Sequence, residues 1–581
     1  MIWWLTHAHR AQAERTVLAE LHERVDWLTG VQWRVAEGMR LAVDFDIVHA
    51  DERFPLTMTY ATFYPDTPPL IVPRDGRRLS MHQYGNGGSL CLEYRADNWD
   101  TSVTGAMMVE SAYRLITGER EDAGPRTVPS AHSETLGQIT RTSVLRFIIT
   151  TSAEVELRKI MPGTIADIGI VEKHYADVWT TTLTNVAGLD VDPAWVQIKG
   201  IPGTWFKAGY AVRLPAGVYI PASLPFEKFC DTLALSGFDT TARISVAQGT
   251  IVELVVISDD ACQFFIAYEH DGAYKSIPYT TILSPDNIAN RLTSEHESLG
   301  AKRVGIVGNG SIGSKVASIL ARSGVRQFRL VDDDIFFSPN IVRNDLAQPA
   351  VGLHKVDGVK ARLEEILGEC DVRVRRVAFG GQESADTMES VMTDLSACDV
   401  IVDATADAQC FNFCAAVART HRKPLIWAEV LAGGIGGIVA RARPHHDPEP
   451  QAVRNRITAW CEAQGVPAPA VPDDGQYEGR SAEGVPLVAD DAEVSVIAAH
   501  TARFVIDALM RPNASIFPVS AYVIGFRADW LFVAPFDTRP IEINGPSDWQ
   551  LDHRESTDDE RIILLQELFP NEINDNDQPA T

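Results

Sequence analysis

Residues 1–142 have the apolar spacing of a small α+β domain. Apolar side chains first recur every third or fourth position, as on one face of a helix, and then every second position, as in half-buried strands. Prolines at 65, 68, 69 and 73 argue against regular structure within 63–73. The predicted elements are a helix at 9–28, strands around 33–35 and 41–48, an extended connection at 63–73 and a helix at 104–116.

Two further domains are predicted after this one. Residues 143–290 are expected to form a β-rich middle domain without a motif that carries chemistry. Short apolar strands then alternate with helical segments, which predicts a Rossmann-like α/β domain over 291–540. The Pro-, Gly- and acid-rich stretch 444–491 is predicted to be a crossover loop, and 541–581 a C-terminal tail. The predicted strands are 304–307, 328–331, 400–403, 425–427 and 436–441. One predicted helix ends at 320, and three more span 355–367, 409–420 and 494–509.

The composition is that of a globular protein, with 45% hydrophobic and 22% charged residues over 581 positions. The 78 acidic and 52 basic side chains give a formal charge of −26, which repels phosphate backbones and acidic membrane surfaces. No apolar run reaches the ~20 residues that span a bilayer. The eight cysteines form no C-x-x-C pair, which argues against a disulfide framework or a thiolate zinc site. We therefore expect a reduced, cytoplasmic protein that binds neither nucleic acid nor membranes.

A glycine-rich turn follows the first predicted strand of the α/β domain. Gly308, Gly310 and Gly313 precede a helix, and such turns bring backbone N–H groups and a helix N-terminus close to phosphate. The next strand ends in the acidic run Asp332 to Asp334, about twenty residues on, where an acid can hold ribose hydroxyls. These two features predict a nucleotide site, and they fit a nicotinamide cofactor as well as ATP.

The segment after the acidic run separates these two interpretations. Asn340, Arg343 and Lys355 follow it, and two cations beyond a ribose-binding acid suit neutralisation of a triphosphate during attack at its α-phosphorus. Over residues 291–535 the pattern resembles the ubiquitin-activating enzyme superfamily with its ThiF and MoeB relatives. The resemblance implies that Asp332 binds the ribose of ATP. It also implies that Asn340 and Arg343 contact the phosphates and that Lys355 stabilises developing charge.

The same resemblance implies Mg²⁺, held by an acid in a D-x-T-D-N pattern after a later strand. This chain reads D-A-T-A-D at 403–407, so the acid is displaced by one position. We favour Asp407 as the magnesium ligand and expect Asp403 to be structural at the strand end. Arg291 is a candidate for the superfamily's N-terminal arginine, which one subunit often contributes to its partner's site across a dimer interface.

Cys91 has the most informative setting of the cysteines. It follows Gly88, precedes Trp99, and lies downstream of the motif Y-P-D-T-P-P at 64–69. A free cysteine is commonly a small buried residue, so the cysteine alone would say little. Together these positions resemble the ubiquitin-conjugating enzyme family over about residues 10–120. The resemblance implies that Cys91 is a catalytic thiol that carries a thioester.

This second resemblance has one local departure. Where the family has H-P-N, this chain reads H-Q-Y at 82–84. The family's asparagine is thought to stabilise the oxyanion of thioester attack, so its loss leaves that task to Asn86 or to a backbone N–H. We therefore expect altered transfer chemistry at Cys91.

The other cysteines are weaker candidates. Cys461 is the only cysteine of the predicted crossover loop, where activating enzymes that hand on a protein place their own thiol, so it is a candidate first thiol. Its neighbours Ile457 and Trp460 equally fit a short packed helix, and the adenylate would then pass directly to Cys91. Expected core residues are Cys370, Cys398, Cys410 and Cys414.

The two resemblances together predict a fused two-step enzyme. Adenylation converts a carboxylate into a mixed anhydride, and a thiolate then attacks it and releases AMP. The domain order resembles the fused enzymes of bacterial anti-phage operons, including the cyclic-oligonucleotide (CBASS) type. That likeness implies activation of the C-terminus of a ubiquitin-like protein or a nucleotidyltransferase, and transfer to an acceptor amine on another protein. The superfamily resemblance also implies a homodimer.

Two alternatives remain open at this stage. The first is an adenylating enzyme for sulfur-carrier or peptide modification, whose conjugating-like domain only binds protein, so that Cys91 would be dispensable. The second is a nucleotide-binding scaffold, which would bind ATP without exchanging pyrophosphate.

Overall fold

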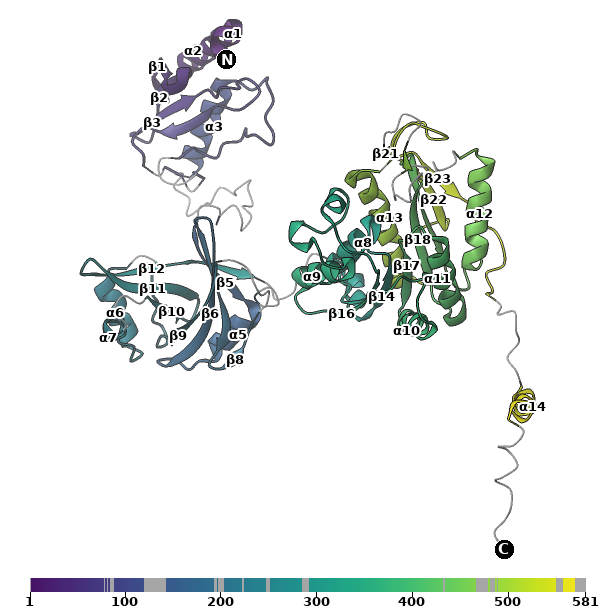
Figure 1. The fold of residues 1–581 in the computed structure, drawn as a ribbon. Helices are drawn as coiled ribbons and strands as arrows, with labels where there is room; N and C mark the ends of the chain where they lie inside the picture. Colours follow the sequence, from purple (N-terminus) through teal and green to yellow (C-terminus); the bar gives the residue numbers. More distant parts are fainter. Residues whose placement is uncertain are drawn as a thin grey trace. The chain divides into compact units, whose positions relative to one another are not determined.

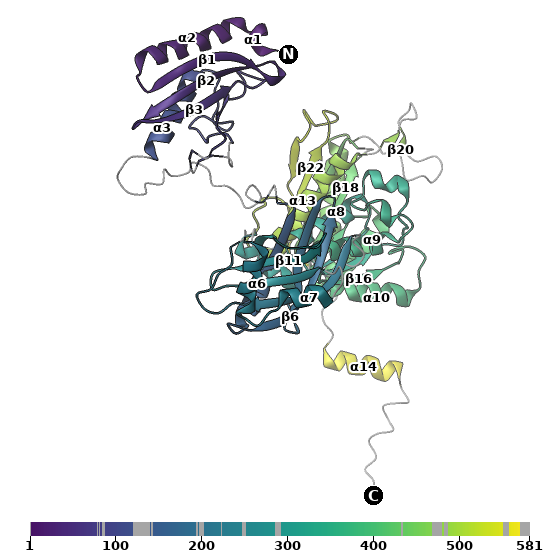
Figure 2. The ribbon, with the colours of Figure 1, turned by 90° about the vertical axis from the view of Figure 1, so that its left-hand side faces the viewer.

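The computed structural model describes residues 2–77, 79–80, 82–83, 88–119, 140, 143–192, 196, 203–221, 224–246, 251–284, 292–431, 434–466, 479–480, 486–487, 489–549 and 557–569. The chain forms two compact units, Met1–Arg141 and Thr142–Thr581. Figures 1 and 2 show their elements from two directions.

The first unit is an antiparallel meander in the order β1-β2-β3-β4, packed against the helices α2 and α3. Apolar residues of the sheet and of both helices, such as Leu18, Phe45 and Val109, form one buried core. The N-terminal helix ends at Arg24, short of the predicted 28, because Leu28 already begins the first strand. The elements are α1 (Trp3–Thr6), α2 (Ala8–Arg24), β1 (Leu28–Ala36), η1 (Glu37–Met39), β2 (Arg40–His49), β3 (Glu52–Thr59), β4 (Leu70–Pro73) and α3 (Gly105–Gly118).

The second unit begins with a nine-stranded mixed sheet, in keeping with the predicted β-rich stretch. Its strands run β12-β11-β10-β9-β6-β7-β5-β13, with β8 paired to β7, and apolar clusters lie on both faces. The elements are β5 (Leu145–Thr150), α5 (Thr151–Lys159), β6 (Ile165–Tyr175), β7 (Val178–Val186), β8 (Leu189–Asp190), β9 (Thr204–Arg213), α6 (Phe226–Ala234), α7 (Thr240–Val246), β10 (Val252–Ile257), β11 (Cys262–His270), β12 (Ala273–Pro278) and β13 (Thr280–Ser284).

The α/β part of the second unit has an eight-stranded sheet in the order β16-β15-β14-β17-β18-β19-β22-β23. The first five strands are parallel and the last three are antiparallel to their neighbours. Helices α8, α9 and α13 cover one face and α10, α11 and α12 cover the other, each with its own apolar core (Figure 1). A parallel sheet covered on both faces requires strands that are apolar throughout, which the sequence pattern already indicated.

Its strands are β14 (Arg303–Val307), β15 (Gln327–Val331), β16 (Asp371–Arg375), β17 (Val400–Asp403), β18 (Leu425–Leu431), β19 (Gly436–Ala442), β20 (Gly479–Arg480), β21 (Pro486–Leu487), β22 (Ala521–Gly525) and β23 (Thr538–Ile541). Its helices are η4 (Ser294–Ala301), α8 (Ser311–Arg322), η5 (Ser338–Val342), η6 (Gln348–Ala350), α9 (Lys355–Leu367), α10 (Ala385–Ser396), α11 (Ala408–His421), α12 (Pro450–Ala463), α13 (Asp491–Met510) and α14 (Asp558–Leu568).

A buried ion pair joins strand β19 to helix α13. The Arg441 guanidinium lies 2.8 Å from Asp507, and both side chains are at most 2% exposed. Arg441 also donates to the Ser515 hydroxyl, and its guanidinium stacks over the Phe504 ring. The guanidinium therefore has further partners besides Asp507. A buried pair of this kind fixes how the helix sits on the sheet more than it adds net stability.

Two predicted boundaries are wrong. The predicted crossover loop 444–491 contains helix α12, whose inner face buries Val453 and Ile457 in the core. The domain also continues past the predicted boundary at 540, because Trp549 is 1% exposed and its indole N–H donates to the Asp447 carbonyl.

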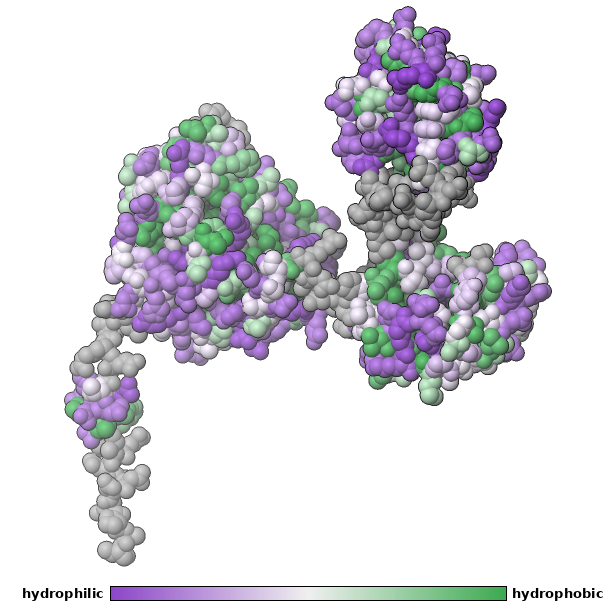
Figure 3. Space-filling model, turned by 180° about the vertical axis from the view of Figure 1, so that it is seen from behind, coloured by the Kyte–Doolittle hydropathy of each residue, from purple (hydrophilic) through white to green (hydrophobic). Residues whose placement is uncertain are grey.

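Helix α14 lies in the predicted tail. Apolar residues such as Ile562, Leu564 and Leu568 are exposed on it, and Figure 3 shows hydrophobic and hydrophilic residues side by side on its visible face. Among the described helices none is both long and apolar enough to cross a membrane. The part of the tail beyond residue 569 lies outside the described residues.

Candidate functional site

A cavity of about 790 Å³ lies beyond the carboxyl ends of three adjacent parallel strands, β14, β15 and β17. Strand β14 is where the strand order reverses, and such switch points are where open α/β sheets bind ligands. The predicted residues that line the cavity are Gly308, Gly310, Asp332, Asp334, Asn340, Arg343, Lys355 and Asp407. Residues separated by almost a hundred positions thus meet at one edge of the sheet.

The glycines of the turn have three different roles. Gly308 has a φ of +82°, and a Cβ there would lie 2.8 Å from Thr405 Cγ2. Gly313 does not line the cavity, since a Cβ there would lie 1.9 Å from the Gly308 carbonyl oxygen, so its role is close packing. A Cβ on Gly310, the N-cap of α8, would meet no described atom within 4 Å. Space is therefore left in front of the helix N-terminus, where N–H groups favour an anion.

Asp332 is held rigidly at the end of β15. Its carboxylate accepts the Asn309 backbone N–H over 2.5 Å and the Asp334 N–H over 2.9 Å. Burial raises the pKa of Asp332, and these two hydrogen bonds act in the opposite direction. The strand end therefore presents a fixed carboxyl group to the cavity.

Two cationic side chains face the same cavity. Lys355, the first residue of α9, donates from Nζ to Asp334 over 2.5 Å, and its side chain is 13% exposed. Arg343 is half-buried at the end of η5. Asn340 shapes this short helix by accepting the Phe337 backbone N–H over 2.9 Å. Both cations can therefore approach an anion bound at the start of α8.

Asp407 is the N-cap of α11 and also lines the cavity. One of its oxygens accepts the N–H groups of Gln409 and Cys410, each over 2.8 Å. Ala406 before it has a left-handed φ of +57°, which turns the chain between the strand and the helix. Carboxylate oxygens are the donors that Mg²⁺ prefers, so Asp407 and the acidic run fit such an ion chemically. Asp403 is 3% exposed and accepts from Thr405.

Several cavity residues had no motif in the sequence. The segment 377–381 after β16 lines the cavity because its strand ends at the same edge, and no local pattern indicated this. Cys410, expected in the core, also lines the cavity, and burial raises the pKa of its thiol to about 12. Cys370 is only half-buried, whereas Cys398 and Cys414 are core residues as expected. Arg291 and Asn86 lie outside the described residues.

In the first unit, Cys91 is half-buried at the end of a short antiparallel pairing. Gln83 and Leu90 form its bridge, and the Cys91 backbone N–H donates to the His82 carbonyl over 2.7 Å. Trp99, further along the chain, donates its indole N–H to the Pro65 carbonyl over 2.7 Å. The proline motif and the tryptophan, matched separately in the sequence, are thus in direct contact.

A buried carboxylate ties this part of the unit together. Glu14 of α2 accepts from the hydroxyls of Tyr60 and Tyr64 over 3.0 and 2.5 Å, and from the Gly105 N–H at the start of α3 over 2.6 Å. Arg10 pairs with the same carboxylate over 3.0 Å. The proline motif and both helices are therefore fixed to each other.

Cys461 lies on the inner face of α12, not on a loop. It is 5% exposed and packs within the same core as Val453 and Ile457. Burial raises the pKa of its thiol to about 11, and the nearby Glu429 and Glu462 act in the same direction. A neutral buried thiol is a poor nucleophile. The short packed helix is thus the alternative that the structure bears out.

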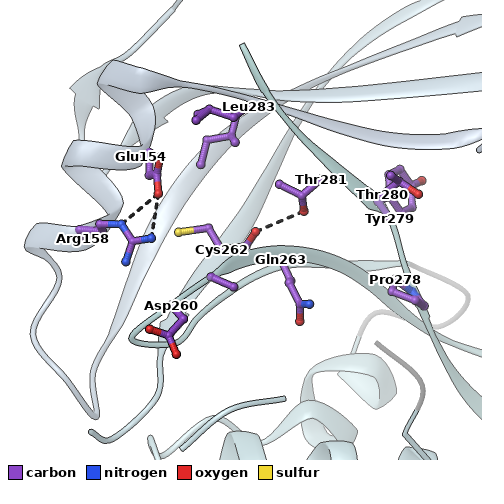
Figure 4. Close-up of a pocket in the computed structure, with 12 residues that line it drawn as sticks. Glu154, Arg158, Asp260, Cys262, Gln263, Pro278, Tyr279, Thr280, Thr281 and Leu283 are labelled. Atoms are coloured by element: carbon purple, nitrogen blue, oxygen red, sulfur yellow. Dashed lines mark hydrogen bonds and ion pairs between the residues drawn. The ribbon is translucent and has the colours of Figure 1, made fainter. Parts of the chain in front are cut away.

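A second cavity of about 480 Å³ lies beside β11 and α5 (Figure 4). Arg158 on its wall bonds to Glu154 over 3.0 and 2.8 Å and to the Asp259 carbonyl. Burial raises the pKa of Cys262, whose sulfur points toward this pair, to about 11. A satisfied ion pair and a neutral thiol favour a structural role for these residues.

Comparison with known proteins gives one family match and several partial relatives. Residues 286–516 match the ThiF family. The uncharacterized protein y4oA of Sinorhizobium fredii is 30% identical over 156 residues, 25% of this chain and 26% of that protein. The ATP-dependent ubiquitin transferase-like protein Cap2 of Enterobacter hormaechei is 33% identical over 107 residues, 18% of this chain and 17% of Cap2.

A solved structure of E. coli MccB with ATP has 17% identity and a TM-score of 0.32, over 43% of this chain and 66% of that chain. The chain spans only 26% and 17% of the length of the two curated relatives named above. The family match falls on the stretch that holds the cavity and its glycine-rich turn. Residues 286–516 therefore form a ThiF-family domain.

Proposed function

We propose that the ThiF-family domain uses ATP and Mg²⁺ to adenylate the C-terminal carboxylate of a small protein or peptide. The observation that carries this is the single cavity into which the α8 N-terminus, Asp332, Arg343 and Lys355 all face. Its volume of about 790 Å³ is in the range of small-molecule sites. The family match and the Cap2 likeness support the same activity.

The residues act together on a triphosphate bound in this cavity. Asp332 orients the ribose, and the α8 N-terminus with Arg343 neutralises the phosphates. A carboxylate oxygen of the substrate attacks the α-phosphorus, the bond to the β-phosphate oxygen breaks, and pyrophosphate leaves. Lys355 stabilises the charge that develops in this step. Mg²⁺, held by Asp407 with the acidic run, would further neutralise the leaving pyrophosphate.

We further propose that Cys91 receives the acyl group as a thioester and passes it to an acceptor amine. A ubiquitin-like protein or a nucleotidyltransferase C-terminus is the proposed substrate, and a homodimer the proposed assembly. The hydrogen bond between Trp99 and Pro65, which joins two parts of the motif that surrounds Cys91 in the sequence, supports this assignment. Because Cys461 is buried, we propose direct passage of the adenylate to Cys91.

Two assays on the full chain test the proposal. ATP–pyrophosphate exchange with candidate proteins encoded beside this gene measures adenylation. Non-reducing gels with and without a thiol reductant then detect a thioester. Exchange without a thiol-labile adduct would favour the alternative, in which the first unit only binds protein. ATP binding without exchange with any candidate would favour a nucleotide-binding scaffold.

A further inference from the structure

His82 lies directly opposite Cys91 in the short antiparallel pairing of the first unit. The bridge between Gln83 and Leu90 and the 2.7 Å hydrogen bond from the Cys91 N–H to the His82 carbonyl fix this register. Directly opposed residues have their side chains on the same face, with Cβ atoms about 5 Å apart. Gln83 and Leu90 are 6% and 5% exposed and point into the core. The imidazole and the thiol therefore share the outer face.

Glu119, the residue that caps α3, lies near this histidine. One Glu119 carboxylate oxygen lies 4.0 Å from His82 Nε2 and accepts the Ser80 hydroxyl over 2.8 Å. The Ser80 oxygen accepts the His82 backbone N–H over 2.8 Å. The side chains of His82 and Glu119 are 15% and 13% exposed, so water screens their attraction only in part. The carboxylate of Glu119 and the His82 imidazole therefore lie close together, both largely shielded from water.

We propose that His82 is the proton acceptor of Cys91 and that Glu119 is the positioning residue that orients His82. The inference rests on the proposed transfer through Cys91. The thiol proton moves to the imidazole and leaves a thiolate, which attacks the carbonyl carbon of the acyl adenylate. The C–S bond forms, the bond from that carbon to the AMP oxygen breaks, and AMP leaves. Pairing with a histidine is a known way to ionise a cysteine at neutral pH.

The test is alkylation of Cys91 by iodoacetamide in the full chain, read on the Cys91 peptide by mass spectrometry at pH 7 and pH 9. A thiol with the ordinary pKa of about 8.5 reacts roughly 25-fold faster at pH 9, because its thiolate fraction rises by that factor. We expect a ratio below about threefold in the wild type. His82→Gln should restore the ratio to roughly 25-fold and slow alkylation at pH 7 by about tenfold.

Glu119→Gln should give an intermediate ratio, because the imidazolium loses its carboxylate partner. It also serves as the second variant if His82→Gln unfolds the first unit. Matched controls are His9→Gln, an exposed histidine of α2, and Glu110→Gln, whose side chain pairs with Arg24. Both controls should keep the wild-type ratio.

A wild-type ratio near 25-fold, or an unchanged ratio in both His82→Gln and Glu119→Gln, would overturn the proposal. The assay needs neither ATP nor a protein substrate, so its outcome is independent of adenylation. A normal thioester with an unactivated thiol refutes only the role of His82. An activated thiol that never forms an adduct refutes the proposed transfer instead.

Discussion

Cys91 and Cys461 are both candidate thiols, yet their surroundings differ in every respect that matters for reactivity. Cys461 faces inward from a helix, is 5% exposed, and has carboxylates nearby that raise its pKa further. Cys91 is half-buried at a strand end, directly opposite a histidine that itself faces a carboxylate. The comparison teaches that the reactivity of a cysteine depends more on the residues around its thiol than on the sequence segment that contains it.

The largest expected effect is the complete loss of the thiol-labile adduct in Cys91→Ala. No other group would accept the acyl chain, whereas Cys461→Ala should form the adduct at the wild-type level. Cys91→Ser should give an adduct that survives reductant, because an oxygen ester resists thiols. Non-reducing gels measure all three variants. An adduct that disappears in Cys461→Ala and persists in Cys91→Ala would mean that Cys461, and not Cys91, carries the acyl group.

Lys355→Ala should lower the rate of ATP–pyrophosphate exchange by about 10²–10³-fold, since it removes one donor to the developing charge. This variant separates adenylation from thiol chemistry, because alkylation of Cys91 should not change. Lys360→Ala is the matched control, since Lys360 lies on the same helix and pairs with Glu364 at 3.9 Å. Equal exchange rates in the two variants would remove Lys355 from the mechanism.

Alkylation should distinguish the two thiols by more than about a hundredfold at pH 7.5 in the folded protein. Burial raises the pKa of Cys461 to about 11, so its thiolate fraction at this pH is far smaller than that of an ordinary thiol. Iodoacetamide labelling, quantified for each cysteine peptide, measures both rates in one sample. Labelling of Cys461 at the rate of an unfolded control would show that α12 opens readily.

The smallest expected effect is on stability. Cys461→Ala removes a buried sulfur from the core beside Val453 and should lower the free energy of unfolding by about 1–2 kcal/mol. Cys91→Ala should change it by less than about 0.5 kcal/mol. Denaturant unfolding measures both values. A larger loss in Cys91→Ala would mean that Cys91 is the structural thiol of the two.

Three parallel strands, β14, β15 and β17, could be predicted from the sequence to within about a residue. Strand β18 runs four residues past its predicted end, and β16 was not predicted. Strands buried on both faces must be apolar along their whole length. Such a run can be recognised in the sequence without knowing which strands pair with it. Helix α12 was missed because the Pro- and Gly-rich residues around it dominate the local composition. Pro450 at its first turn and the spacing of Val453, Ile457 and Cys461 were the available signals.

Site residues that belong to one sequence motif could be predicted. Site residues that come together only through the arrangement of the strands could not. Gly308, Asp332 and Lys355 lie in one stretch of sequence, and they line the same cavity. The segment 377–381 and Cys410 reach that cavity only because parallel strands end at a common edge. The pairing of His82 with Cys91 likewise depends on a register that no spacing rule specifies.

The buried pair of Arg441 and Asp507 has an evolutionary consequence. Loss of either partner alone would leave an uncompensated charge in the core, at a cost of about 3–5 kcal/mol. Replacement of both by apolar residues of similar volume would cost little. Descendants of this sequence are therefore expected to keep both residues or to exchange both, so the two positions should co-vary across relatives and mark the register of α13 on β19.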